Sequence, residues 1–208
     1  FNIRNKNDTA DAQAIWRAVQ QPGKAVAIKT EQQQAMLALH RIRSQLMKFR
    51  LMQTNALHGL LAEYGEVMRK GHASLVRNVP EILARLSGRL PAVLIDSLRE
   101  QLSEVERTDG RITDIERRIR ELSRNDPGVK AISDIPGVGF LTATAAVASM
   151  GSADAFRSGR EFAAWIGPAP RPTGTVGKIQ LPGISTRGHK SPREVLVHCA
   201  HHFIPYTR

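Results

Sequence analysis

Two long stripes of apolar residues constrain the fold of this chain most, because their members recur at the three- and four-residue spacings of a helix face. The first stripe lies between Glu31 and Tyr64, and the second between Ile95 and Leu122. Their members are Met36, Leu39, Ile42, Leu46, Phe49, Leu57, Leu60 and Tyr64, then Ile95, Leu98, Leu102, Val105, Ile112, Ile115, Ile119 and Leu122. Two such helices predict an antiparallel hairpin or a coiled-coil arm, with an ordinary two-helix layer on a core as the alternative. An arm would favour a homo-oligomer.

Turn signals set the expected ends of the helices. A first helix is expected from Asp8 to Val19, ending before Pro22-Gly23. Gly65 is the expected C-cap of the first long helix. The pair Asp109-Gly110 interrupts the second long pattern and is a candidate kink.

The other glycines and prolines divide the chain into regions. Gly71, Pro80, Gly88 and Pro91 predict short helices and turns over residues 66–91. The tetrapeptide Asn125-Asp126-Pro127-Gly128 is a strong turn signal and a good domain boundary. We therefore expect a mainly α fold divided into residues 1–29, 30–126 and 127–208, the last region opening with small helices and continuing as a loop or short hairpin over 168–188.

The composition of the chain indicates which class of partner it binds. The chain has 208 residues, with 30 Lys and Arg against 19 Asp and Glu, a net charge of +11 that favours nucleic acid. Aromatic residues make up only 5%, which argues against a long base-stacking groove. No apolar run reaches the length of a membrane span, and no secretory signal is visible. The single cysteine, Cys199, cannot form an internal disulfide, so a reducing cytoplasm is expected.

A glycine-rich turn is the first candidate site. Ile135-Pro136-Gly137-Val138-Gly139 precedes a run of small residues from Leu141 to Met150. Glycine permits close approach of the backbone, and the start of a helix favours an anion. The turn resembles the hairpin of a helix-hairpin-helix element, so Gly137, Val138 and Gly139 are predicted to bind nucleic-acid backbone. The alternative is a tight turn that only joins two packed helices.

A basic loop follows this turn. Its cations Arg171, Lys178, Arg187 and Lys190 are predicted to contact phosphates. Its hydroxyls, Thr173, Thr175, Ser185 and Thr186, could hold or attack a phosphodiester whose developing charge the cations would stabilise. On the residues alone, a solvated surface loop is the favoured interpretation.

Two further groups of residues are candidate metal ligands. Asp8 and Asp11 lie three residues apart and could present two carboxylates to Mg²⁺. The alternative is that Asp8 caps the helix while Asp11 complements its dipole, and the two roles are compatible. The segment His198-Cys199-Ala200-His201-His202, with His189 as a further candidate, has the spacing of a zinc pair, but a polar C-terminal segment is favoured over a zinc site.

The order and spacing of several segments over roughly residues 1–196 are similar to one family. The chain resembles the DEDD–serine insertion-sequence transposases, the group of the Piv-type DNA invertases and the bridge-RNA-guided recombinases. The segments that carry the resemblance are Arg4 to Ala12, Gln32-Gln33-Gln34, Ile135 to Gly139, Phe156 to Gly167 and Gly183 to Gly188.

The resemblance implies a domain organisation and a chemistry. Residues 1–29 would be the end of a RuvC-like domain that holds Mg²⁺ with four acids, 30–126 a helical or coiled-coil insertion, and 127–208 a small transposase domain. In intact relatives a serine would attack a DNA phosphodiester, the metal site would assist, and a guide RNA would choose the DNA sites. A cytoplasmic, nucleoid-associated location in a prokaryote would follow.

The match to the family pattern is partial. Asp8 and Asp11 align with the last two acids, which places the first Asp and the Glu before Phe1. Gly174 stands at the serine position, so Thr173 or Thr175 could replace the serine only if the loop shifts by a residue. We therefore expect a truncated copy that is catalytically incomplete. The alternatives are a non-catalytic nucleic-acid-binding and oligomerisation remnant, and a helical protein without a nucleic-acid role.

Overall fold

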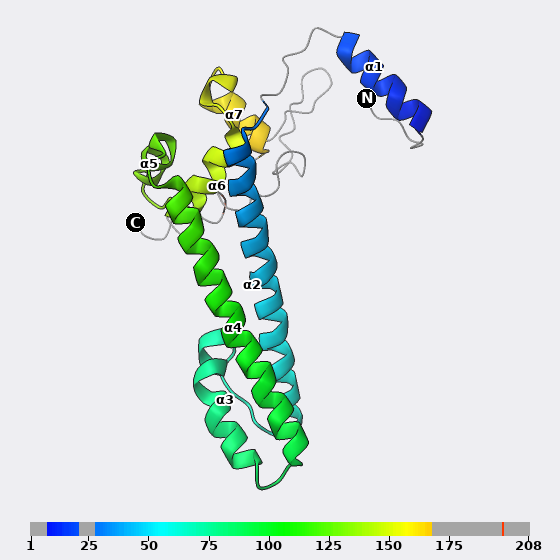
Figure 1. The fold of residues 1–208 in the computed structure, drawn as a ribbon, viewed down its shortest axis with the longest axis vertical. Coiled ribbons are helices and arrows are strands. Elements are labelled where there is room, and N and C mark those ends of the chain that lie inside the picture. Colours follow the sequence, from blue (N-terminus) through cyan, green and yellow to red (C-terminus); the bar gives the residue numbers. More distant parts are fainter. Residues whose placement is uncertain (1–7, 21–27, 168–196, 198–208) are drawn as a thin grey trace, which may run out of the picture.

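The computed structural model describes residues 8–20, 28–167 and Val197. This part of the chain is mainly α, as predicted, with seven α-helices, one short 3-10 helix and no strand. A long arm descends from a cluster of short helices, and both ends of the arm's hairpin lie at that cluster (Figure 1). Among the described residues, no helix is both long and apolar enough to cross a membrane.

Helix α1 (Asp8–Gln20) confirms the first predicted helix. It buries none of its residues, and Ile15, Trp16 and Val19 are exposed. The described part of this helix begins at Asp8, so the prediction that Asp8 caps the helix stays a prediction. Asp8 and Asp11 both lie in the first turn, where a carboxylate complements the helix dipole.

The two long helices confirm the predicted antiparallel hairpin. Helix α2 (Glu31–Glu63) runs down the arm, and α4 (Ala92–Ser123) returns beside it (Figure 1). Thr30 begins α2 with a capping box, because its hydroxyl accepts from the Gln33 N–H at 3.2 Å while the Gln33 side chain accepts from the Thr30 N–H at 2.9 Å. Both bonds satisfy donors that a helix start leaves without partners.

The C-cap of α2 is Tyr64, and Gly65, the predicted C-cap, is the next residue, at the C′ position. The φ of Gly65, 84°, is in the left-handed region, which glycine enters at no steric cost. The Gly65 N–H donates to the Ala62 carbonyl at 3.0 Å, and the Glu66 N–H donates to the Leu61 carbonyl at 3.1 Å. This pair of bonds is a Schellman motif, and it turns the chain back along the arm.

Helix α3 (His72–Leu86) corrects the prediction of short helices and turns over 66–91. Pro80 lies inside this helix, where it removes one backbone hydrogen bond. The helix nevertheless forms because one face is buried against α2 and α4, and burial at about 25 cal/mol per Å² of apolar surface outweighs one lost bond. The buried residues of α3 are Leu75, Val79, Ile82, Leu83 and Leu86.

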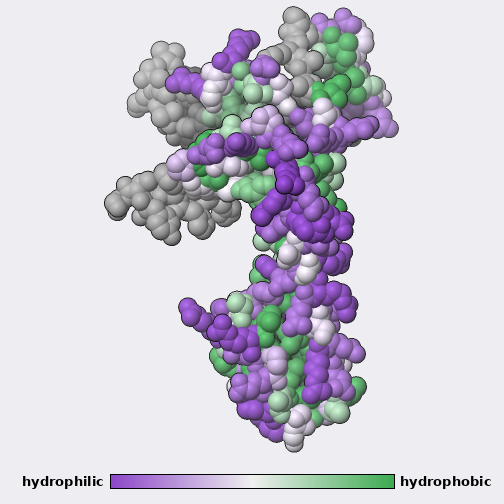
Figure 2. Space-filling view, turned by 60° about the vertical axis from the view of Figure 1, so that its left-hand side comes forward, coloured by the Kyte–Doolittle hydropathy of each residue, from purple (hydrophilic) through white to green (hydrophobic). Residues whose placement is uncertain are grey.

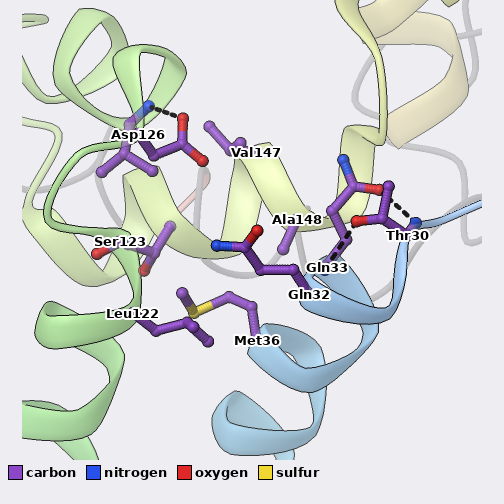
Figure 3. Close-up of a pocket in the computed structure, with 11 residues that line it drawn as sticks. Thr30, Gln32, Gln33, Met36, Leu122, Ser123, Asp126, Val147 and Ala148 are labelled. Atoms are coloured by element: carbon purple, nitrogen blue, oxygen red, sulfur yellow. Dashed lines mark hydrogen bonds between the residues drawn. The ribbon is translucent and has the colours of Figure 1, made fainter.

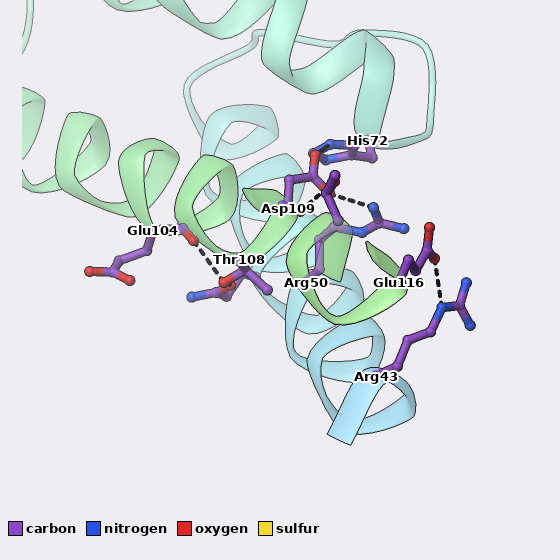
Figure 4. A network of polar contacts seen from close by, with 9 residues as sticks. Arg43, Arg50, His72, Glu104, Thr108, Asp109 and Glu116 are labelled. Carbon is purple, nitrogen blue, oxygen red and sulfur yellow. Dashed lines mark hydrogen bonds and ion pairs between the residues drawn. The ribbon is translucent and has the colours of Figure 1, made fainter. Parts of the chain in front are cut away.

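Two charged pairs lie in the middle of the seam between α2 and α4. Arg43 Nε is 2.6 Å from Glu116 Oε1, and Arg50 Nη1 is 2.5 Å from Asp109 Oδ1. His72, at the start of α3, also contacts the Asp109 carboxylate (Figure 4). All five side chains are partly buried. Figure 2 shows that hydrophilic residues cover most of the middle of the arm on the face it presents.

These pairs fix the register of the hairpin. The two arginines are seven residues apart on α2, and their acids are seven residues apart on α4 in the opposite direction. The same register places buried Leu57 opposite buried Leu102. A shift by one heptad would still set Arg43 opposite Asp109, but it would set Arg50 opposite Leu102 and leave Glu116 beside Met36, so two of the four charges would lose their partners.

The two charged pairs also correct the prediction of which residues of α2 face the partner helix. Ile42, Phe49 and Leu60 were expected to face the partner helix, but they are 42%, 44% and 40% exposed. The seam instead follows a heptad line through the two arginines. Arginine can occupy such positions because its apolar stem packs while its head meets a carboxylate.

Asp109-Gly110 does not end the second helix, and the predicted kink at this pair stays a prediction. Helix α4 is continuous through both residues. Asp109 is held by Arg50 and His72, and a Cβ at Gly110 would meet nothing within 4 Å, so neither residue strains the helix.

The short helices pack at the upper end of the arm. They are α5 (Pro127–Ser133), α6 (Phe140–Met150), the 3-10 helix η1 (Ala153–Ala155) and α7 (Gly159–Ile166). The Asp126 side chain caps α5 by accepting from the N–H groups of Gly128 and Val129. Helix α6 packs against α2, α4 and α5, which explains why its small residues are buried on all sides. The position of α6 therefore depends on both long helices.

Replacing Asp109 with leucine should lower the free energy of unfolding by about 2 kcal/mol, because Arg50 and His72 then lose their shared acceptor. The double variant Arg50→Leu/Asp109→Leu should recover most of that loss, since two apolar residues fill the same layer. Urea unfolding measures both effects. The control is Arg99→Ala, which breaks an exposed pair with Asp96 and should change stability by less than about 0.5 kcal/mol. Equal losses in Asp109→Leu and in the control would contradict the seam assignment.

Candidate nucleic-acid interface

The predicted glycine-rich turn joins α5 to α6. The two helices pack against each other, and the Val138 N–H donates to the Ile135 carbonyl at 3.0 Å, which closes the turn. Gly137 has a φ of 83°, a conformation that a larger residue would adopt only with strain. Gly137 and Gly139 are exposed, whereas Val138 is half-buried.

The start of α6 is open. Gly139 occupies the N-cap position in an extended conformation, and no side chain caps the helix. A Cβ at Gly139 would meet no described atom within 4 Å. By contrast, Asp126 caps α5 and Ser158 caps α7. An uncapped helix start is suited to an anion, although α3 and α4 also lack a side-chain cap.

Sequence reasoning missed Arg120 of α4, which lies beside this turn, and two further cations, Arg124 at the end of α4 and Lys130 on α5. The Arg120 guanidinium stacks over the ring of Phe140, the first residue of α6, at 4.9 Å from the ring centroid. Arg124 and Lys130 are exposed, and neither forms an ion pair with a described residue. In the sequence, the available signal was the group of basic residues at the end of the second apolar stripe. Only the packing of α4 against α6 brings Arg120 to the turn.

The remaining predicted nucleic-acid and catalytic residues lie outside the described residues. These are Arg171, Thr173, Thr175, Lys178, Arg187 and Lys190. The same holds for Gly174 and for the histidines of the candidate zinc segment. Their assigned roles stay predictions.

Asp8 and Asp11 are exposed on α1. Among the described residues, no group of three or more acidic, histidine or cysteine side chains is placed to hold a metal ion. Two exposed carboxylates do not by themselves form the ligand set that Mg²⁺ requires, and no chemical step is derived from them. Magnesium binding by Asp8 and Asp11 stays a prediction.

A polar contact joins the arm to α6. His40 Nε2 lies 3.0 Å from the hydroxyl oxygen of the fully buried Thr144, whose own proton is donated to the Phe140 carbonyl at 3.1 Å. Burial, and secondly the charge of Arg43, lowers the pKa of His40 to about 4. His40 is therefore neutral near pH 7, and it ties α2 to the helix that begins at the turn.

The part of the chain that contains this turn matches a known family. Residues 129–207 match the family model described as "Transposase IS116/IS110/IS902 family". The match begins within α5 and includes the turn, α6, α7 and the basic loop.

Two relatives are similar over almost the whole chain. The transposase for insertion sequence element IS1328 of Yersinia enterocolitica is 37% identical over 203 residues, which covers 96% of this chain and 59% of that protein. The transposase for insertion sequence element IS1111A of Coxiella burnetii is 35% identical over 205 residues, which covers 98% of this chain and 56% of that protein. The chain thus spans more than half, but less than two thirds, of the length of these relatives.

Acid should weaken the contact between the arm and α6. The pKa of His40 is about 4 when folded and about 6.5 when unfolded, so the unfolded chain binds more protons between these values. The His40 contribution is therefore complete above pH 6.5 and is lost as the pH falls toward 4, by about 2–3 kcal/mol.

Urea unfolding at pH 7 and pH 4.5 measures this loss. The variant His40→Gln keeps an N–H donor for Thr144 but does not titrate, so it should lose less stability on acidification than the wild-type chain. If the wild-type chain and His40→Gln lose equal stability on acidification, His40 is not the group responsible for the loss.

Proposed function

We propose that this chain acts in DNA transposition and binds the DNA backbone at the turn between α5 and α6. The observation that carries the proposal is the family match over residues 129–207, which begins six residues before the turn. The net charge of +11 and the open start of α6 support it. Backbone N–H groups and nearby cations contact phosphates without reading sequence.

A second nucleic acid would select the DNA sequence at which the protein acts. The resemblance to bridge-RNA-guided recombinases supports a guide RNA that selects DNA sites by base pairing, while the protein holds backbone and shape. Arg120 beside the turn, and the exposed Arg124 and Lys130, which form no ion pair with a described residue, would serve either nucleic acid.

We propose that this chain binds nucleic acid without completing the reaction by itself. Gly174 at the serine position of the resembled family supports this. Incubation with DNA, Mg²⁺ and a trap for covalent intermediates is therefore expected to give no protein–DNA adduct. An adduct that disappears in Thr173→Ala or Thr175→Ala would contradict the proposal and identify the nucleophile.

The exposed apolar residues of α2 support a homo-oligomer that forms through the arm. Ile42, Phe49 and Leu60 lie on one side of this helix, beside the seam, and remain partly exposed. A second arm could bury this stripe and recover part of its hydrophobic free energy.

Phe49→Glu should convert the oligomer to a monomer, because a charge in the centre of the stripe would be buried without a partner. The control is Leu51→Glu, since Leu51 is also exposed but lies on the opposite side of α2. Light scattering coupled to size-exclusion chromatography measures the mass. A monomeric wild-type chain, or equal dissociation by both substitutions, would contradict assembly through this stripe.

Gly139→Asp should reduce the affinity for duplex DNA by about tenfold at low salt, because its carboxylate would occupy the anion position at the start of α6. The matched variant Gly139→Asn caps the helix equally well without a charge, and it should bind within about twofold of the wild-type chain. Fluorescence anisotropy with a labelled duplex, repeated at increasing salt, measures the affinity, which should fall steeply with salt.

Gly88→Asp controls for the change in net charge. Gly88 is exposed in the loop between α3 and α4, and a Cβ there meets nothing within 4 Å. If Gly139→Asp and Gly88→Asp weaken binding equally, the turn does not bind the backbone. If the wild-type chain does not bind DNA even at low salt, the proposed function itself is wrong.

A further inference from the structure

A small pocket lies where the arm meets the short helices. It has a volume of about 130 Å³, and the first turn of α2, the last turn of α4, α5 and α6 surround it (Figure 3). Met36 and Ser123, which line it, are opposite each other in the register set by the charged pairs. The pocket therefore exists because the seam aligns the start of α2 with the end of α4.

Most polar groups around the pocket already have partners. The Thr30 hydroxyl and both ends of the Gln33 side chain are hydrogen-bonded, the latter to the Thr30 N–H and to the Gly151 carbonyl. The Ser123 hydroxyl donates to the Ile119 carbonyl at 2.9 Å. These groups hold the wall of the pocket and leave few bonds for a ligand.

Two groups remain available. The Gln32 amide extends from α2 into the pocket and bonds to no described residue (Figure 3). Asp126 uses Oδ1 to accept from the Gly128 and Val129 N–H groups, whereas Oδ2 has no described partner. A ligand would thus meet one carboxylate oxygen and one amide between the side chains of Met36, Leu122 and Val147.

These two polar groups restrict the class of ligand that could bind in the pocket. A phosphate would be repelled by the Asp126 carboxylate, and a divalent cation needs more oxygen ligands than one carboxylate supplies. An apolar ligand would leave Asp126 and Gln32 unpaired, at a cost in affinity. A flat heterocycle with an amino group beside a ring nitrogen fits, because the amine can donate to Asp126 while the Gln32 amide bonds the ring.

We propose that this pocket holds one unpaired nucleobase that carries an exocyclic amine. The proposal rests on the proposed function, since the base would belong to nucleic acid bound near the turn. The exposed cations Arg124 and Lys130 flank the pocket residues Asp126 and Val129 in sequence and are available for the adjoining phosphates. One base held between aliphatic side chains needs no aromatic groove, which agrees with the low aromatic content.

Homopolymers of cytosine and thymine test the proposal, because the two bases have similar size and differ at the 4-position amine, at N3 and at the 5-methyl group of thymine, which the uracil in the RNA comparison lacks. Fluorescence anisotropy should show labelled oligo(dC) binding about fivefold tighter than oligo(dT) of equal length at pH 7.5 and low salt. Oligo(rC) and oligo(rU) repeat the comparison for RNA, and the larger of the two ratios identifies whether the base comes from DNA or RNA.

Asp126→Asn should abolish the preference for cytosine. Asparagine still caps α5, so the fold is kept, while an amide replaces the carboxylate acceptor. Glu121→Gln makes the same charge change at an exposed site on α4 outside the pocket and should keep the fivefold ratio. Gln32→Leu, which leaves the cap untouched, should reduce the ratio as well.

The outcomes separate this proposal from the proposed function. Equal affinities of the wild-type chain for cytosine and thymine, or equal ratios in Asp126→Asn and Glu121→Gln, would overturn the pocket proposal while nucleic-acid binding stands. No binding of any oligonucleotide or duplex at low salt would overturn both.

Discussion

The two charged pairs between α2 and α4 set the geometry on which the other features of the structure depend. Arg43 with Glu116 and Arg50 with Asp109 allow only one alignment of α2 and α4, because a shifted hairpin would leave charges opposite apolar residues. Apolar layers alone would tolerate several alignments, since one leucine can replace another across a seam. Specificity of register is thus gained from polar pairs, while Leu57, Leu102 and the α3 face supply the burial.

This alignment has consequences at the upper end of the arm. It brings the capped start of α2 beside the end of α4, and α6 packs across both. The contact of His40 with Thr144 and the stacking of Arg120 on Phe140 then fix α6 from two sides. The glycine-rich turn is presented from this fixed helix, which contacts α2, α4 and α5, and the domain boundary expected near Asp126 stays a prediction.

The sequence was sufficient to predict the helical hairpin, the end of α2 next to Gly65 and the turn before α6, because each depends on local spacing or on glycine. Prediction was wrong for α3, where tertiary burial overrides Pro80, and for Ile42, Phe49 and Leu60, where charged residues occupy the seam. The seven-residue spacing of Arg43 and Arg50, matched by Asp109 and Glu116, was the available signal. Arg120 and the pocket could not be predicted, since both arise from contacts between helices distant in sequence.

The central claim is that a turn held by the arm binds nucleic-acid backbone through the start of α6. Amide hydrogen exchange on the wild-type chain, with and without duplex DNA at low salt, tests this claim most directly. Residues 137–142 should become protected on adding DNA, while the amides of α3 at the far end of the arm should be unchanged. Protection confined to other segments, with unchanged exchange over residues 137–142, would contradict the account.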